Sequence, residues 1–162
     1  MRTKVLLISS LLLIMLFSGC GILQQVKGLD LRGTWLGEGT PDNNDEAGAI
    51  GFYITTQQSG QFSGSFMAYF EEGPVPVGFE PAMKGLGFDM TGTVDIEGNV
   101  EMNIKEKILI GDPDEPEYWK WVFTGTVEGD QMSGSYYEAI VDEDDQVVDD
   151  SESTGTWTVT RE

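Results

Sequence analysis

Apolar and polar residues alternate with a period of two along most of this chain, and this alternation constrains its fold more than any other feature. The alternating segments are rich in Thr, Val, Phe, Tyr and Trp, which favour strands, and no helical periodicity follows residue 20. The pattern predicts an all-β protein. The expected strands cover residues 33–39, 48–58, 61–70, 85–96, 99–110, 117–128, 131–141 and 153–161.

The connections between these strands alternate in length. The sequences QSGQ, EGN and EGDQ are short, glycine-centred turns that suit hairpins, whereas the other connections are long and hold all 6 prolines and most of the 28 acidic residues. Because alternate connections of an up-and-down meander lie at opposite ends, the short turns should share one end. We therefore expect an eight-stranded antiparallel up-and-down β-barrel over residues 32–162, with a closed base and an acidic, open mouth.

One face of each expected strand is apolar, as with Phe88, Met90, Val94 and Ile96 in the segment 85–96. Strands that close on themselves in this number enclose an interior that side chains can fill, or that can hold one small ligand. Closure also leaves no exposed strand edge to aggregate. The sequence does not decide between an interior filled by side chains and a hollow one.

The first twenty residues, MRTKVLLISSLLLIMLFSGC, are typical of a targeting segment rather than of the fold. Their apolar run, 5–17, is shorter than the roughly 20 residues of a membrane-spanning helix. The Ser-Gly pair before Cys20 resembles a bacterial lipobox, in which the thiol is acylated and the chain is cut before the cysteine. This resemblance implies a cleaved lipoprotein signal peptide at 1–19 and a lipidated N-terminus and linker at 20–31. The alternative is an ordinary secretory signal in which Cys20 has no role.

Acylation at Cys20 would attach the protein to a membrane of the cell envelope, with the barrel outside the cytoplasm. Gly21 follows the cysteine, in place of the aspartate of an inner-membrane retention signal, so we expect the outer membrane if the host has two. Cys20 is the only cysteine, and its acylation would leave no thiol for a disulfide, a metal or nucleophilic catalysis.

The charge of the chain argues against several kinds of partner. The formal net charge is −19, which repels nucleic acid, whose phosphates must be neutralised on binding, and also repels anionic lipid headgroups. The chain contains no histidine, which excludes histidine acid–base catalysis, Ser-His triads and ordinary zinc sites. We expect neither a cofactor nor an enzymatic activity.

The two ends of the expected barrel carry similar sequences, DLRGTWLGEG near its start and STGTWTVTRE at its end. In a closed meander the first and last strands pair. The run Gly33-Thr34-Trp35 and the final Arg161 resemble the Gly-x-Trp and the closing basic residue of the calycins, the superfamily of lipocalins, fatty-acid-binding proteins and avidins. The resemblance implies that Arg161 packs across Trp35 at the closed base, a contact worth about 0.5–2 kcal/mol.

Among the calycins, the chain is most similar in local sequence to the avidins, at the segments GTW and SGQFSGSF. It departs from them at Gly37, which stands where an avidin would have a polar ligand-binding side chain, so biotin binding is not implied. The Thr-Asp-Tyr element of typical lipocalins is absent as well. The resemblance therefore implies a fold and leaves the ligand open.

Two carboxylates, Glu106 and Glu138, fall on the apolar register of strands that run toward the mouth. Inside an aromatic-lined barrel such a carboxylate can recognise a cationic ligand, with added attraction from ring faces. The alternative is that a bulge turns them outward or that they are solvated at the rim. They could also form an acid–base pair like that of glycosidases, but nothing else in the chain supports catalysis. The candidate rings are Phe66, Trp119, Trp121 and Tyr136.

The acidic loops offer oxygen ligands of the kind that Ca²⁺ prefers. The candidates are Asp42 and Asp45 in DNNDEAG, and Asp142 and Asp144 in DEDD. Neither stretch follows the EF-hand spacing, and Ala47 stands where the turn glycine belongs. The alternative is that these acids are solvated surface.

Together these features predict a monomeric, lipid-anchored, non-enzymatic barrel that binds a small apolar or cationic molecule in its interior. The alternative function is that of a filled barrel, an envelope structural module whose acidic loops contact a basic protein partner. An interior cavity would favour the first function, and a packed interior the second.

Overall fold

The computed structural model describes residues 29–43, 47–69, 87–108, 116–148 and 151–162. The described part of the chain contains no helix able to cross a membrane. It consists of strands that follow one another in sequence, joined by turns. The strands are β1 (Gly33–Pro41), β2 (Gly48–Gln58), β3 (Gln61–Tyr69), β4 (Phe88–Val94), β5 (Asn99–Lys107), β6 (Tyr118–Glu128), β7 (Gln131–Val141) and β8 (Ser153–Arg161).

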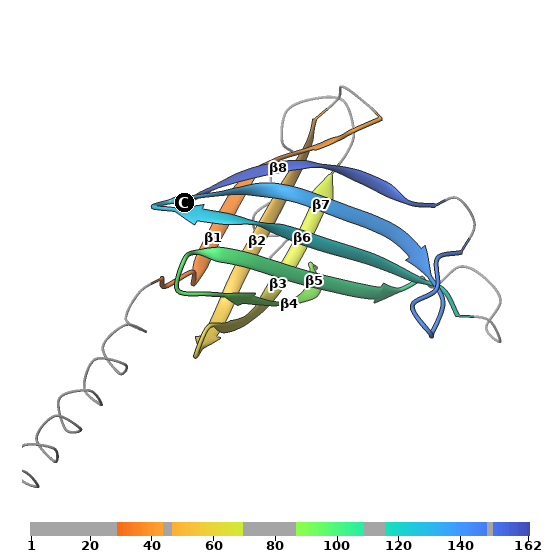
Figure 1. Cartoon of the computed structure of the whole chain (residues 1–162), viewed down its shortest axis with the longest axis horizontal. Coiled ribbons are helices and arrows are strands. Elements are labelled where there is room, and N and C mark those ends of the chain that lie inside the picture. Colours follow the sequence, from red (N-terminus) through yellow and green to blue (C-terminus); the bar gives the residue numbers. More distant parts are fainter. Residues whose placement is uncertain (1–28, 44–46, 70–86, 109–115, 149–150) are drawn as a thin grey trace, which may run out of the picture.

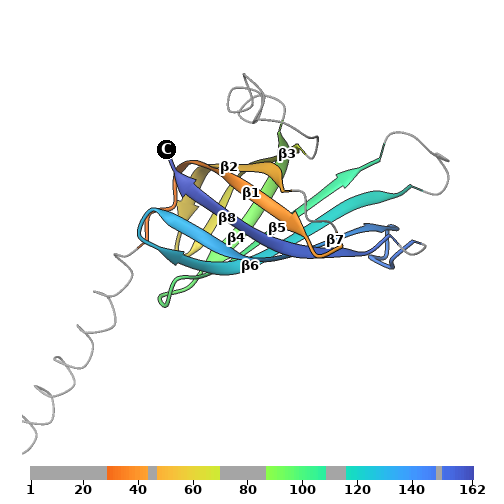
Figure 2. The ribbon, with the colours of Figure 1, turned by 90° about the horizontal axis from the view of Figure 1, so that it is seen from above.

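These strands form one closed barrel in which each strand pairs with its neighbours in the sequence, β1-β2-β3-β4-β5-β6-β7-β8. All the pairings are antiparallel, and closure is completed by β1 and β8, from Trp35 opposite Arg161 to Pro41 opposite Gly155. Figures 1 and 2 show β1, in orange, beside β8, in dark blue. The structure therefore confirms the predicted eight-stranded antiparallel barrel.

The short turns lie together at one end of the barrel, the base. In the turn between β2 and β3, the Gly60 carbonyl accepts a hydrogen bond of 2.7 Å from the N–H of Val94, the last residue of β4. The turns between β4 and β5 and between β6 and β7 accept equivalent bonds from Val127 (2.9 Å) and Arg161 (2.8 Å). Each turn is thus bonded to the base end of the next even-numbered strand, β4, β6 or β8. The long connections consequently begin and end at the opposite end, the mouth.

The strand expected over residues 85–96 extends too far at its C-terminal end. Strand β4 ends at Val94, and Ile96, which was expected on its apolar face, is 74% exposed in the turn that follows. The side chain of Asp95 ends the strand, because its Oδ1 accepts hydrogen bonds from the backbone N–H of Glu97 (2.8 Å) and Asn99 (2.9 Å). A turn of this kind, held by an aspartate side chain, competes with continuation of the strand.

The middle of the barrel is filled by aromatic side chains that point inward from four strands. The rings of Phe52, Phe66, Phe123 and Trp157 contact one another, with centroids 5.1–5.8 Å apart in offset, tilted or edge-on arrangements. The indole N–H of Trp157 donates to the carbonyl of Ser135 at 3.0 Å, which satisfies its polar atom inside the core. The barrel is therefore packed at this level.

A short segment before β1 closes the base. Leu31 is 0% exposed and belongs to the core, although the sequence predicted that it would be part of a linker. Its backbone is bonded on both sides: the Trp35 indole N–H donates to Leu31 O (2.8 Å), and Leu31 N–H donates to Gln57 Oε1 (2.7 Å). The Gln57 amide in turn donates to Leu29 O (2.5 Å).

The expected contact between the two ends of the barrel is present in the same layer. The guanidinium carbon of Arg161 lies 4.6 Å from the centre of the Trp35 ring, and this guanidinium also donates a hydrogen bond to the carbonyl of Asp30. Gly33, which begins β1, has a φ of 131°, a conformation that glycine adopts without strain. Residues from both ends of the chain thus hold the closing segment in place.

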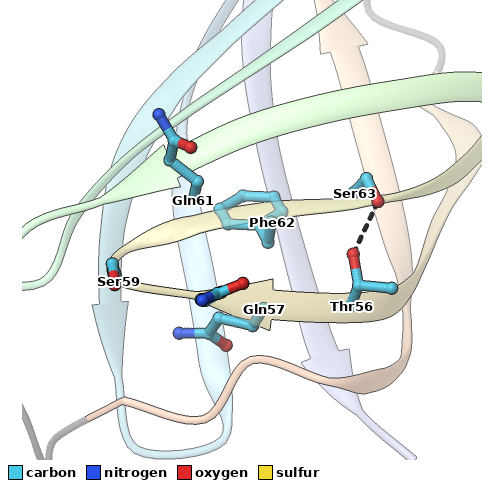
Figure 3. Close-up of a pocket in the computed structure, with 7 residues that line it drawn as sticks. Thr56, Gln57, Ser59, Gln61, Phe62 and Ser63 are labelled. Carbon is cyan, nitrogen blue, oxygen red and sulfur yellow. Dashed lines mark hydrogen bonds between the residues drawn. The ribbon is translucent and has the colours of Figure 1, made fainter.

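A β-bulge in β2 makes Gln57 available to this segment. The register with β3 shifts between Ile54 and Thr56, so the chain gains one residue on β2 and the faces of the strand exchange. Gln57 therefore lies opposite the buried Phe62, where an unbroken alternation would have placed it on the outer face. Figure 3 shows this turn region, with the hydrogen bond of 2.7 Å between Thr56 and Ser63 beside the bulge.

Candidate functional site

Two carboxylates face inward near the mouth, from β5 and β7, which lie on either side of β6 (Figure 1). Along β5 the buried residues Met102 and Ile104 alternate with exposed ones, so Glu106 also lies on the inward register, where it is half-buried. Glu138 follows the buried Tyr136 on the inward register of β7 and is half-buried too. The registers of β5 with β6 and of β6 with β7 contain no shift at these positions, so no bulge turns either carboxylate outward.

Each of these carboxylates lies opposite an indole of the central strand β6. Glu106 pairs with Trp119, and Glu138 pairs with Trp121 one step deeper in the barrel. The two indoles contact each other, with ring centroids 5.5 Å apart and planes inclined by 57°. They differ in exposure, because Trp121 is 5% exposed and Trp119, at the rim, is 42% exposed.

The two carboxylates differ in electrostatic environment. Burial raises the pKa of the Glu138 carboxyl above its ordinary value, and a hydrogen bond from the Trp121 indole acts in the opposite direction. Burial also raises the pKa of the adjacent Tyr136 to about 12, and the negative charge of Glu138 contributes to this increase. Within the described residues, no lysine or arginine forms an ion pair with Glu106 or Glu138. Glu138 is therefore a desolvated carboxylate whose charge the described chain does not compensate.

The structure separates the predicted rings into two groups. Phe66 is 0% exposed and lies within the central aromatic cluster, so it supports the core rather than lining an accessible wall. Tyr136 belongs to the same group, because it lies opposite Phe123 and contacts its ring with centroids 5.7 Å apart. Trp119 and Trp121 instead lie opposite the two carboxylates. Phe88 was not among the predicted site rings, yet its ring stacks on Trp121 with centroids 5.8 Å apart and planes at 18°. Only its position on the apolar face of an expected strand indicated that this ring would point into the barrel.

Lysines of the same strands point away from the interior. Lys105 of β5 and Lys120 of β6 lie directly opposite each other on the outer surface. Their like charges are bridged by Asp145 of the β7–β8 connection, at 2.6 Å from Lys105 Nζ and 3.2 Å from Lys120 Nζ. These two lysines also hold the pKa of Asp145 below its ordinary value. Lys105 and Lys120 are therefore engaged in ion pairs outside the barrel.

The acidic residues considered for calcium have other roles where they are described. The Oδ1 of Asp142 accepts hydrogen bonds from the N–H of Asp144 and of Gln146, both at 2.9 Å, and so shapes its own loop. The carboxylate of Asp42 accepts a bond of 2.7 Å from Thr154. Asp45 lies outside the described residues, and among those described no group of three or more acidic, histidine or cysteine side chains could hold a metal ion.

Two hollows on the outer surface are lined by described residues. One, of about 570 Å³, surrounds the β2–β3 turn at the base (Figure 3). Its lining is uncharged, and one of its side chains, Gln57, is already bonded to the closing segment. The other, of about 470 Å³, lies over β4, β5 and β6 and includes Thr93, Glu101 and Thr124. Neither brings a carboxylate and an aromatic face together as the mouth does.

The chain shows remote similarity to some solved structures. No protein-family model matches the chain, and no curated protein matches it. Among solved structures, the chain is similar to the bradavidin2–biotin complex, with 18% identity, a TM-score of 0.44, and coverage of 83% of this chain and 99% of that one. It is also similar to apo shwanavidin in two crystal forms, with 9% and 12% identity, TM-scores of 0.43, and coverage of 83% of this chain and 98% of each of those. The fold assignment rests on the strand pairing of this chain, and its ligand must be inferred from its own residues.

Proposed function

We propose that this barrel is a non-enzymatic binding protein for a small organic cation, which it holds at its mouth on Glu138, Trp119 and Trp121. The observation that carries the proposal is the pairing of a half-buried carboxylate with an indole on the inward face of the barrel. The charge of this carboxylate has no cationic partner among the described residues.

Physical chemistry favours a cationic ligand over an apolar one at this level. A carboxylate that has lost part of its hydration gains most from a partner that restores ion pairing and hydrogen bonding. An ammonium group also gains about 0.5–2 kcal/mol from an indole face, depending on how far it is desolvated. The contacting rings of Phe52, Phe66, Phe123 and Trp157 fill the middle of the barrel, which argues against the expected ligand site in the interior. The ligand would therefore rest above these rings, at the mouth.

Calorimetry of the full-length chain with butylammonium tests the proposal. We expect saturable binding that Glu138→Gln weakens at least tenfold, because the amide keeps the shape of the side chain and removes its charge. Glu101→Gln is the matched control, since Glu101 is exposed on the outer face of β5 and should leave the affinity unchanged. Absence of binding, or equal affinities for the Glu138 variant and the unchanged protein, would overturn the proposal.

We further propose that the protein is attached to an envelope membrane through an acylated Cys20, with the mouth directed away from the membrane. The lipobox-like sequence supports the attachment, and the first described residue, at the closed base, supports the orientation. Incorporation of labelled palmitate into the chain, abolished by Cys20→Ser, is the expected result. Equal labelling of the variant would contradict the attachment.

A further inference from the structure

Resting on the proposed function, we infer that the cation taken by the mouth has two charged ends: a linear diammonium ion, with one ammonium on Glu138 and the other on Glu106. The class of ligand is then the α,ω-diamines and the polyamines that contain them.

The argument begins with a repetition in the site. Glu106 lies opposite Trp119, and Glu138 lies opposite Trp121, so a carboxylate next to an indole occurs twice on the inward face. The two indoles, 5.5 Å apart, join the two halves. Each half supplies a charged partner for one ammonium, and the exposed Trp119 indole supplies an apolar surface for the methylene chain that joins the two ammonium groups.

The spacing of the two carboxylates fits a chain of a few methylenes. Glu106 and Glu138 are two strands apart, about 10 Å, and two residues apart along the strand direction, about 7 Å, so their Cα atoms are separated by about 12 Å. In an extended chain three bonds advance about 3.5 Å, so the nitrogens of 1,4-diaminobutane lie about 6 Å apart. An N–H···O bond of about 2.9 Å at each end lets this diamine join carboxylate oxygens up to about 12 Å apart. The oxygens of Glu106 and Glu138 lie closer together than their Cα atoms, because both side chains point into the barrel, so this diamine is long enough to join them.

The charges around the site favour the same ligand. Lys105, Lys107 and Lys120 belong to the outer face of β5 and β6, so among the described residues they do not compete for the inward carboxylates. A single ammonium would compensate only one of the two carboxylates. The formal net charge of −19 additionally attracts a dication more strongly than a monocation of similar size.

Calorimetry of the full-length chain at physiological salt compares four probes: butylammonium, 1,2-diaminoethane, 1,4-diaminobutane and 1,5-diaminopentane. We expect the two longer diamines to bind at least tenfold more tightly than butylammonium. The shortest diamine should gain less than the longer ones, because its nitrogens are only about 3.5 Å apart and reach carboxylate oxygens no more than about 9 Å apart. This comparison needs no variant, so it is independent of any effect on folding.

Variants then assign the two ends of the ligand. Glu106→Gln should reduce the advantage of 1,4-diaminobutane over butylammonium to less than threefold, whereas Glu138→Gln should weaken the binding of both probes at least tenfold. Glu101→Gln should weaken neither, and a thermal melt of each variant checks that it is folded. If the longer diamines bind no more tightly than butylammonium, or if Glu106→Gln leaves their advantage intact, the two-ended ligand is overturned while the cation site stands. If no probe binds, the proposed function fails together with this inference.

Discussion

Replacement of Leu31 by alanine should destabilise the barrel although this residue precedes the first strand. Leu31 is 0% exposed and packs in the core that β1 to β8 enclose. Truncation of a buried leucine costs about 2–5 kcal/mol, since the lost transfer free energy adds to the cost of the cavity left behind. The Leu31 backbone is held by Trp35 and Gln57, which limits collapse of the segment into the space, so we expect about 3 kcal/mol.

Urea denaturation of the full-length chain, followed by the fluorescence of its tryptophans, measures this loss. With a denaturant dependence of about 2 kcal/mol per molar urea, a loss of 3 kcal/mol lowers the midpoint by about 1.5 M. Ile96→Ala is the matched control, because Ile96 is 74% exposed and its truncation should move the midpoint by little. If Leu31→Ala shifts the midpoint no more than Ile96→Ala does, the segment before β1 does not close the base.

Three further predictions concern the base, the barrel wall and the mouth. Arg161→Leu removes the contact with Trp35 and the bond to the Asp30 carbonyl, and should cost about 2 kcal/mol in urea denaturation, whereas the exposed Arg32→Leu should leave the midpoint unchanged. Gly155→Ala would place a Cβ 2.6 Å from Tyr136 Cε1, and should lower the free energy of unfolding by about 1–3 kcal/mol. Because the pKa of Glu138 is raised in the folded state, the folded state binds a proton more readily than the unfolded state does. The charged carboxyl therefore lowers the free energy of unfolding at neutral pH. This loss disappears below pH 4.5, the ordinary pKa of a glutamate. Glu138→Gln should therefore raise the melting temperature at pH 7 and lose this gain near pH 4; an equal gain at both would contradict the assignment.

The barrel could be predicted from the sequence because its determinants are local or symmetric. The alternation within strands fixes which face is buried, and a closed interior requires this pattern in every strand. Glycine-centred turns fix which connections are tight. The pairing of Trp35 with Arg161 follows from ring closure, since the first strand of a closed meander can find its second neighbour only in the last. The inward register of Glu106 and Glu138 follows from the same alternation.

What the sequence did not reveal depends on single residues that break the alternation. The bulge between Ile54 and Thr56 adds one residue to β2, and no composition signal marks it, because the polar residues around it suit either face. Since Gln57 reaches the closing segment only through this bulge, the burial of Leu31 was hidden as well. The prediction for Ile96 was wrong for the opposite reason. Its apolar side chain fitted the alternation, but the hydrogen bonds of the Asp95 side chain begin a turn before it.

The two ends of the barrel differ in how fully their polar groups are satisfied, and this difference supports the proposed binding at the mouth. At the base each tight turn is bonded to the end of β4, β6 or β8, and although Arg161 Nε lacks a hydrogen bond, the Asp130 carboxylate lies 3.7 Å from it. At the mouth Glu138 is half-buried next to Trp121, with its pKa raised and with no cation supplied by the described residues. A desolvated charge without a cationic partner among the described residues is a cost to folding, and a filled structural barrel could remove it with a single substitution to an apolar residue. A binding protein keeps such a charge, because the ligand offsets the cost, and the stability supplied at the base makes it tolerable at the mouth.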